Sequence, residues 1–391
     1  MPARTVYADN AATTAISQKV LSAMTPFLIE NYGNPSSIYS LAAKSRHGIE
    51  TARVQVAEAL NAQAEEIFFT GGGTESDNWA IRSGVLANAK KGKHIITTAI
   101  EHPAVLNTCK ALKKEGYELT VLGVDALGRV SPEDLRAALR EDTALVSVMI
   151  ANNEIGTIEP IARLAAITKE NGALFHTDAV QAAGHVAVDV KKLGVDLLSI
   201  SGHKFKGPKG VGALFIRKGL RLSPLIIGGG HERGLRSGTE NVASIVGMGA
   251  ALEDACAKLT TSVRYTRKLC KRLIDGVLKI PYTRLTGDPD DRLPGTASFV
   301  IEFIEGESMV LMLDGAGISA SSGSACSSGS LDPSHVLLAL GLPHEVAHGS
   351  LRLTINEDND EEDIDYIAAE LPRIVSRLRE MSPLWDDKKK G

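Results

Sequence analysis

The sequence predicts an α/β protein built around a mostly parallel sheet. Between about residues 67 and 216, short apolar runs alternate with helical patterns, and this alternation favours crossover units that join parallel strands. The chain has 391 residues, of which 43% are hydrophobic, enough to bury the core of one large domain and of a smaller one. In sheets of this kind, ligands bind beyond the carboxyl ends of the strands.

The expected elements follow one another in a regular order. The opening VYADNAATT is typical of an extended segment that packs on a distant part of the chain, and a helical pattern follows around Val20, Met24 and Leu28. After the turn cluster NYGNPSS, a long helix is expected over residues 41–60. Strands are expected at residues 67–70, 94–98, 118–122, 144–150, 173–176, 197–200 and 211–216, with helices between them. The acidic run 356–365 is expected to open a further helix, because carboxylates suit the positive end of a helix dipole.

Composition excludes several classes of protein. A formal net charge of -4 and the lack of a basic stripe argue against a nucleic-acid partner. The start MPARTVYADN has no apolar core of a signal peptide, and no run of about 18 apolar residues follows, so neither a membrane span nor export is expected. The cysteines show no CxxC pair, which favours a reducing, cytoplasmic compartment and gives a metal site little support. They are Cys109, Cys256, Cys270 and Cys326.

Polar residues follow four of the expected strands. In GGGTESDN, three glycines follow an apolar run, and Thr74 can cap the helix that follows, whose N-terminus suits an anion. A plain tight turn explains the glycines equally well. In EHPAV and NNEIGT, His102 and Asn153 come after apolar runs, where each can contact a ligand or serve the fold alone. In HTDAVQ, Asp178 ends an apolar strand, where a carboxylate needs a partner unless it caps the next helix.

The stretch DLLSISGHKFKGPKG places Lys204 just after an apolar strand. A partly desolvated lysine can lose its proton near neutral pH and form a Schiff base with an aldehyde cofactor such as pyridoxal phosphate. An aspartate such as Asp178 can hold the pyridinium nitrogen of that cofactor protonated, which makes the ring an electron sink. Taken alone, Lys204 is more simply a solvated loop lysine, so the prediction depends on the residues around it.

Ten segments in one order carry a resemblance to a known family. They are YADNAATT, GNPSS, GGGTESDN, EHPAV, NNEIGT, HTDAVQ, SGHKFKGPKG, GGGHERGLRSGT, GSACSSGSLDPSHVLLALGL and GSLRLTI. With them, the chain resembles the pyridoxal-phosphate enzymes of fold type I and, more narrowly, the cysteine desulfurases of the IscS/NifS type in the class V aminotransferase family. The resemblance implies a large domain over residues 15–258 with a mostly parallel seven-stranded sheet. It also implies a smaller α+β domain from both chain ends, residues 1–14 and 259–391.

The resemblance implies roles for the residues around the ring of the cofactor. Lys204 is expected to form the Schiff base with pyridoxal phosphate and later to move the α proton of the substrate. Asp178 is expected to hold the pyridinium nitrogen, Gln181 to donate to the ring hydroxyl, and His102 to stack on the ring.

The resemblance also implies contacts to the cofactor phosphate and to the substrate. Thr239, in the RSGT motif, is expected to contact the cofactor phosphate from a second subunit, so a homodimer is expected. Asn153 and Arg352 are expected to bind the carboxylate of L-cysteine, the arginine as a bidentate donor, and Asn153 also to contact the cofactor. No metal ligand is implied. The expected contacts to the phosphate end of the cofactor are Gly73, Thr74, Ser201, His203 and Thr239.

The stretch SSGSACSSGS surrounds one cysteine with serine and glycine, a composition that predicts a mobile loop over residues 321–331. The resemblance implies that Cys326 attacks the sulfur of cofactor-bound L-cysteine, so that L-alanine leaves and a persulfide remains. His102 is the candidate proton acceptor for the thiol. The persulfide then passes to an acceptor or iron–sulfur scaffold protein, with which Cys326 could also ligate a cluster. A linker with an incidental cysteine is the alternative.

Two other functions stay open at this point. The chain could be another enzyme on the same scaffold, a selenocysteine lyase or an aminotransferase, in which Cys326 is dispensable for turnover. It could also be a sulfur carrier that binds partners and catalyses nothing.

Overall fold

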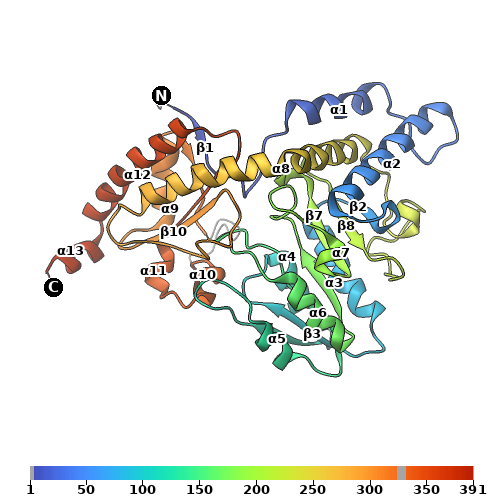
Figure 1. Cartoon of the computed structure of the whole chain (residues 1–391), viewed down its shortest axis with the longest axis horizontal. Helices are drawn as coiled ribbons and strands as arrows, with labels where there is room; N and C mark the ends of the chain where they lie inside the picture. The colour runs from blue at the N-terminus through green and yellow to red at the C-terminus, as the bar shows by residue number, and fades with distance from the viewer. Residues whose placement is uncertain (1–3, 324–331, 391) are drawn as a thin grey trace.

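The computed structural model describes residues 4–323 and 332–390 (Figure 1). A seven-stranded sheet with its helices forms one part, and a three-stranded antiparallel sheet with further helices forms the other. The long helix α8 (Val242–Val277) runs along both parts, as Figure 1 shows.

The seven-stranded sheet confirms the predicted α/β fold. Its strand order is β2-β8-β7-β6-β5-β3-β4, and strands β7, β6, β5, β3 and β4 pair in parallel while β8 runs antiparallel to both of its neighbours. Each predicted strand is present within a few residues. The strands are β2 (Ile67–Thr70), β3 (His94–Thr98), β4 (Glu118–Leu122), β5 (Thr143–Ser147), β6 (Leu174–Asp178), β7 (Leu197–Ser201) and β8 (Gly212–Ile216).

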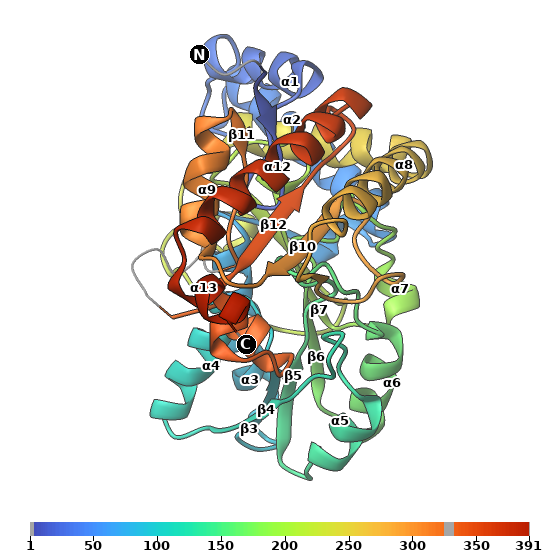
Figure 2. The same cartoon turned by 90° about the vertical axis from the view of Figure 1, so that its left-hand side faces the viewer.

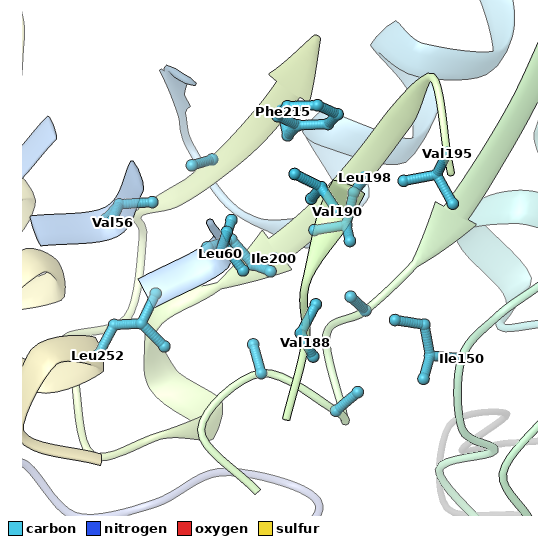
Figure 3. Packing of buried hydrophobic residues seen from close by; sticks show 14 of the residues in the cluster. Val56, Leu60, Ile150, Val188, Val190, Val195, Leu198, Ile200, Phe215 and Leu252 are labelled. Atoms are coloured by element: carbon cyan, nitrogen blue, oxygen red, sulfur yellow. The ribbon is translucent and has the colours of Figure 1, made fainter. Parts of the chain in front are cut away.

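Helices cover this sheet and bury its main core. Figure 3 shows side chains of α2, β7, β8 and α8 meeting there, among them Leu60, Ile200, Phe215 and Leu252. The helices are α1 (Gln18–Ile29), α2 (Ser40–Leu60), α3 (Gly73–Ala87), α4 (Pro103–Lys114), α5 (Pro132–Ala138), α6 (Ile161–Asn171) and α7 (Val190–Leu193), with short 3-10 turns η1 (Ala64–Glu66), η2 (Gly202–Lys204) and η3 (Glu232–Gly234).

One predicted helix cap is wrong. Thr74 does not cap α3, because the helix begins one residue earlier, at Gly73. The residue before the helix is Gly72, which has no side chain, so no side-chain cap bond is present there.

The second part combines both ends of the chain. The extended start packs on a distant segment, as predicted: β1 (Val6–Tyr7) pairs in parallel with β11 (Ile318–Ser319). The three-stranded sheet has the order β12-β10-β9, and Figure 2 shows α12 crossing it. Its elements are β9 (Thr283–Leu285), β10 (Thr296–Ile301), β12 (Ser350–Thr354), α9 (Gly306–Gly315), α10 (His335–Ala339), α11 (His344–His348), α12 (Glu361–Glu380) and α13 (Pro383–Lys390).

The acidic run does open a helix. Asp360 is the N-cap of α12, and its side chain and that of Asp363 each accept a backbone N–H in a capping box. The apolar face of α12 then packs on the three-stranded sheet, where Ile367 and Leu371 join Phe299 and Leu351 in one core.

Helix α8 contributes to both cores. Its first half buries Met248 and Leu252 against the seven-stranded sheet, and its last turns bury Leu273 and Val277 beside the three-stranded sheet. Residues 253–265 between them contain no buried side chain. The domain boundary at residue 258 stays a prediction, and it falls within this exposed middle of the helix.

Two further observations concern membrane-spanning helices and thiols. Among residues 4–323 and 332–390, no helix has both the length and the apolar character that a membrane crossing requires. Cys109 and Cys270 are buried and Cys256 is partly buried, whereas Cys326 lies outside the described residues.

Candidate active site

The carboxyl edge of the seven-stranded sheet brings the predicted residues together. Asp178 is the last residue of β6, and Lys204 ends the turn η2 that follows β7. His102 follows β3 as the N-cap of α4, and Asn153 lies in the loop after β5. Parallel strands expose these positions on one side of the sheet, as the sequence predicts.

The side chain of Lys204 is held against the N-terminal segment. Its Nζ donates to the carbonyl oxygens of Ala11, at 2.6 Å, and Ala12, at 2.9 Å. The Nε2 of Gln181 donates to the same Ala11 oxygen at 3.0 Å. Lys204 and Gln181 therefore meet at one carbonyl group. Behind them, the ring of His185 bonds the carbonyl oxygen of Lys204 at 2.8 Å, which fixes the lysine backbone.

Asp178 is buried beside two other titratable groups. Burial raises the pKa of its carboxyl group, while the nearby His102 and Lys204 oppose that shift. Its Oδ1 accepts the N–H of Val180 at 2.8 Å. Asp178 does not cap a helix, because a turn follows it and the next helix begins at Val190. Burial also lowers the pKa of His102, against the influence of Asp178 and together with that of Lys204. Each of the three groups therefore feels the charges of the other two.

The hydrogen bonding of His102 fixes its tautomer. Its Nδ1 accepts the backbone N–H of Ala104 at 3.1 Å. Because burial keeps the ring neutral, the ring proton is then on Nε2. In this arrangement His102 donates from Nε2, and it can accept a proton only at Nδ1, in place of the Ala104 contact.

A glycine-lined pocket lies beside Lys204. Its lining includes Gly73, Thr74, Ser201 and His203, the four residues predicted to hold a phosphate within one chain. A Cβ atom on Gly73 would lie 2.7 Å from Cγ2 of Val180, so a larger residue there would force Val180 to move. The first turn of α3 starts at this pocket without a side-chain cap, and uncapped backbone N–H groups at a helix N-terminus attract anions.

Arg352 and Asn153, the two residues expected to bind the substrate carboxylate, lie next to each other. Both are buried, and Nη1 of Arg352 donates to the backbone oxygen of Asn153 at 3.0 Å. Its Nη2 donates to Asp9 Oδ1 at 2.9 Å. The Nε of Arg352 is buried without a hydrogen-bond partner in the part of the chain that the structure describes. A free guanidinium N–H at a buried site suits a carboxylate ligand.

Thr239 is not brought to the pocket of its own chain. It is exposed and does not line the glycine pocket. Its loop nevertheless contacts α3, the helix that begins at the glycine pocket, because Arg236 donates to the carboxylate of Glu75 in α3 at 2.8 and 3.1 Å.

Sequence reasoning missed the support that the N-terminal segment provides. The carbonyl groups of Ala11 and Ala12 hold Lys204, Thr13 bonds Nδ1 of His203 at 3.1 Å, and Thr14 donates to the His203 carbonyl oxygen. Alanine carbonyl groups leave no mark on side-chain composition, so only the extended character of VYADNAATT was available as a signal.

A pyridoxal phosphate group fits these residues. The pocket holds uncapped helix N–H groups for a phosphate. Nζ of Lys204 donates to the carbonyl oxygen of Ala12, a residue that lines the same pocket, and the charge of Lys204 acts on the buried carboxyl group of Asp178. The pKa of His203 is lowered to about 4 by burial and by Lys204 and Lys209, so the His203 ring is neutral near pH 7.

Comparison with known proteins assigns the family. The model of the family Aminotransferase class-V matches residues 6–367. A Cysteine desulfurase IscS of Methanosarcina thermophila is 56% identical over 381 residues, 97% of this chain and 94% of that protein. A Cysteine desulfurase IscS of Clostridium botulinum is 54% identical over 385 residues, 98% of this chain and 97% of that protein.

Solved structures agree with these sequence matches. A NifS-like protein superposes with a TM-score of 0.91 at 40% identity, covering 96% of this chain and 100% of the other. A NifS-like protein from Rickettsia africae gives a TM-score of 0.86 at 32% identity, covering 95% and 100%. The chain belongs to the class V aminotransferase family. Within that family it is a pyridoxal-phosphate-dependent cysteine desulfurase, which confirms the resemblance seen in the sequence.

Proposed function

We propose that the residues gathered at the carboxyl edge of the sheet convert L-cysteine to L-alanine and leave the sulfur as a persulfide on Cys326. The observation that carries this assignment is the convergence of three parts. They are the Lys204, Asp178 and His102 cluster, the glycine pocket, and the Arg352 and Asn153 pair.

The residues that would hold the cofactor follow from these positions. Lys204 would bind it covalently through Nζ, with Asp178 at the pyridinium nitrogen, Gln181 at the ring hydroxyl and His102 against the ring, and Asn153 close by. Pyridoxal phosphate supplies an electron sink for the negative charge that forms at the α carbon of the substrate. The phosphate contacts would be Gly73, Thr74, Ser201 and His203, with Thr239 from a second subunit.

Lys204 would move the α proton of the substrate. In the structure its Nζ is held by two carbonyl groups, which places the amine and leaves it partly buried. Asp178, close enough to influence its charge, keeps positive charge favourable in this region. Charges preorganised in a site that excludes water contribute more than they would in solvent.

Arg352 and Asn153 would orient the substrate carboxylate. The buried and unpartnered Nε of Arg352 is one donor, and its Nη2 is held by Asp9. A planar guanidinium can bind both oxygens of a carboxylate at once. This contact would fix the α carbon in front of Lys204.

Cys326 would then take the sulfur atom. Its thiol must be deprotonated to act as a nucleophile, and an unperturbed thiol with a pKa of about 8.5 is only a few per cent ionised at pH 7. His102 is the proposed proton acceptor, at Nδ1, where the proton would replace the contact with Ala104. We further propose a homodimer, because Thr239 is exposed in its own chain, and a cytoplasmic location. The sulfur would pass to an acceptor or iron–sulfur scaffold protein, with which Cys326 could also ligate a cluster.

The test is an assay of the purified protein with L-cysteine. We expect L-alanine in amounts equal to the sulfur released by a reductant. Without reductant, we expect one added sulfur atom on the peptide that contains Cys326, by mass spectrometry. Cys326→Ser should stop alanine formation and keep the cofactor absorbance, because a protonated hydroxyl is a poor nucleophile toward sulfur.

Cys256→Ser is the matched control. Cys256 is partly buried in α8, so its replacement should leave the persulfide on the Cys326 peptide. Wild-type rates of alanine formation in Cys326→Ser would contradict the proposal and favour a lyase or an aminotransferase. No alanine from the wild-type protein would favour a sulfur carrier.

A further inference from the structure

Glu154 is a buried carboxyl group of the NNEIGT turn that has no role in the assignment above. It is 5% exposed. The neighbouring Asn152 fixes its backbone, because Oδ1 of Asn152 accepts the N–H groups of Glu154, at 2.8 Å, and Ile155, at 3.0 Å. The Nδ2 of Asn152 donates to the carbonyl oxygen of Ile100 at 2.7 Å. The turn that carries Glu154 is therefore tied to the loop that carries His102.

One oxygen of Glu154 lies against both flanks of residues 324–331. The hydroxyl group of Ser334 donates to Oε2 of Glu154. On the other flank, a Cβ atom added to Gly323 would lie 3.0 Å from the same oxygen. The N–H of Gly323 also donates to Oγ of Ser350 in β12 at 3.1 Å. Glu154 thus lies next to both described flanks.

The bond from Ser334 has a fixed direction. Ser334 is the N-cap of α10, and its Oγ accepts the N–H groups of Val336, at 3.1 Å, and Leu337, at 3.4 Å. A hydroxyl group has one proton, and here that proton goes to Glu154. His335, the first residue of α10, donates from Nε2 to the backbone oxygen of Glu101 at 3.0 Å. The start of α10 is therefore fastened to two loops of the large sheet.

Arg352 belongs to the same group of contacts. Its backbone pairs with Ser321 in both directions, at 2.7 and 3.2 Å, and its side chain bonds the backbone of Asn153, the residue before Glu154. Burial raises the pKa of Glu154 to about 7, against the opposing influence of Ser334 and Arg352. The substrate pair and the two flanks of the cysteine segment therefore surround one carboxyl group.

We propose that Glu154 is a positioning residue for sulfur transfer. Through its bond to Ser334 and its packing on Gly323, it holds the two flanks of residues 324–331 in a fixed relation to Arg352 and Asn153. This inference rests on the proposed function. It requires that loss of the carboxyl group slow sulfur transfer to Cys326 while the cofactor remains bound, because no cofactor contact is assigned to Glu154.

Four variants test the proposal: Glu154→Ala, Glu154→Gln, Ser334→Ala and the double variant of Glu154→Ala with Ser334→Ala. Their kcat for alanine formation, KM for L-cysteine and persulfide yield on Cys326 are compared with their cofactor absorbance. We expect Glu154→Ala and Ser334→Ala each to lower kcat and persulfide yield by about tenfold or more, because reacting groups must be held in place. Glu154→Gln should retain most of the activity, since its amide oxygen still accepts the hydroxyl proton. The double variant should be no worse than either single variant, because one contact links the pair.

Glu159→Gln is the matched control. Glu159 is another buried glutamate of the same loop, but its Oε2 accepts the N–H of Val130 at 2.9 Å instead. Its replacement should leave kcat and persulfide yield unchanged. Ser334→Ala at the wild-type rate, or a Glu154→Ala variant that forms persulfide normally, would overturn the inference. If Glu154→Ala fails to fold, Glu154→Gln and Ser334→Ala decide. Wild-type protein that makes no alanine would contradict the proposed function itself, and the inference with it.

Discussion

Buried carboxyl groups in the strand-end loops of the seven-stranded sheet have different partners from those beside the three-stranded sheet. In the loops after strands of the seven-stranded sheet, Glu101 and Glu159 are 0% and 4% exposed, and neither has an ion pair with lysine or arginine in the part of the chain described. Burial raises the pKa of each to about 8. Beside the three-stranded sheet, by contrast, the buried Asp363 pairs with Arg4 at 2.7 Å, and Asp288 pairs with Arg129.

This difference indicates that the buried acids of the strand-end loops lower the stability of the fold. A buried acid without a cation favours its neutral form and disfavours the charged one. The acids whose pKa burial raises lie, among the described residues, between Asp77 and Asp178, the same stretch that supplies the strand-end loops of the site. Local conflicts with stability that cluster at one edge are typical of functional sites. The predictions below test this relation, beginning with the largest expected effect.

Replacement of Lys204 should remove the chemistry altogether. Lys204→Ala lacks the amine that would bind the cofactor, so we expect no lysine-bound absorbance and no detectable alanine formation. Borohydride reduction of the wild-type protein and peptide mapping should place the label on Lys204. The control is Lys206→Ala, which removes the ion pairs of Lys206 with Glu357 and Asp358 and should keep the label. A label on any other lysine would contradict the assignment.

Asp178→Asn tests whether the negative charge of Asp178 contributes to turnover and not to stability. The amide oxygen can still accept the N–H of Val180, so the turn should be preserved, but the negative charge is lost. We expect turnover in cofactor-saturated protein to fall by roughly a hundredfold or more. Because burial disfavours the charged form of Asp178, the melting temperature should not fall with it. Near-normal turnover would refute the catalytic role of the Asp178 charge. A large loss of stability would contradict the inference that buried acids in the strand-end loops carry a cost in stability.

Arg352→Lys tests the contribution of the three-stranded sheet to the site. Lysine keeps the charge but cannot present a planar pair of donors, so KM for L-cysteine should rise by roughly tenfold, with a smaller change in kcat. The control is Arg379→Lys, a buried arginine of α12 that donates to the carbonyl oxygens of Pro281 and Glu302. That variant should melt earlier without a change in KM. Equal KM values for Arg352→Lys and the wild-type protein would rule out the carboxylate contact.

Much of the carboxyl edge of the seven-stranded sheet could be predicted from the sequence, because parallel topology determines where the strand ends lie. Apolar runs locate the strands, and the residues that end them, such as Asp178 and Lys204, must then share one side of the sheet. The glycines of GGGTESDN could likewise be assigned to a helix start. Their cap could not, because Thr74 is a plausible capping residue and only the structure shows that α3 begins before it.

Contacts that depend on the backbone were beyond sequence reasoning. The carbonyl groups that hold Lys204 belong to Ala11 and Ala12, which are far away in the chain and have no side-chain chemistry. The bond between Ser334 and Glu154 joins residues from different parts of the fold, and neither residue type marks it. Cys326 was assigned through resemblance and lies outside the described residues.

The smallest effect on turnover is expected at Glu159, whose replacement should instead change the pH dependence of stability. The folded protein holds a proton on Glu159 up to a pKa of about 8, whereas the ordinary value is 4.5. The stabilising contribution of the neutral acid is therefore fully present below about pH 4.5 and is lost as the pH rises toward 8. In Glu159→Gln, which cannot ionise, this loss is absent. Across that window, the free energy of unfolding of the wild-type protein should fall relative to the variant by up to about 1.4 kcal/mol per pH unit. Thermal melts of both proteins at pH 5, 7 and 9 measure the difference, with the exposed Glu133→Gln as control. A difference in melting temperature that stays constant with pH would show that Glu159 is charged in the folded protein, and the contrast between the strand-end loops and the residues beside the three-stranded sheet would then not extend to this residue.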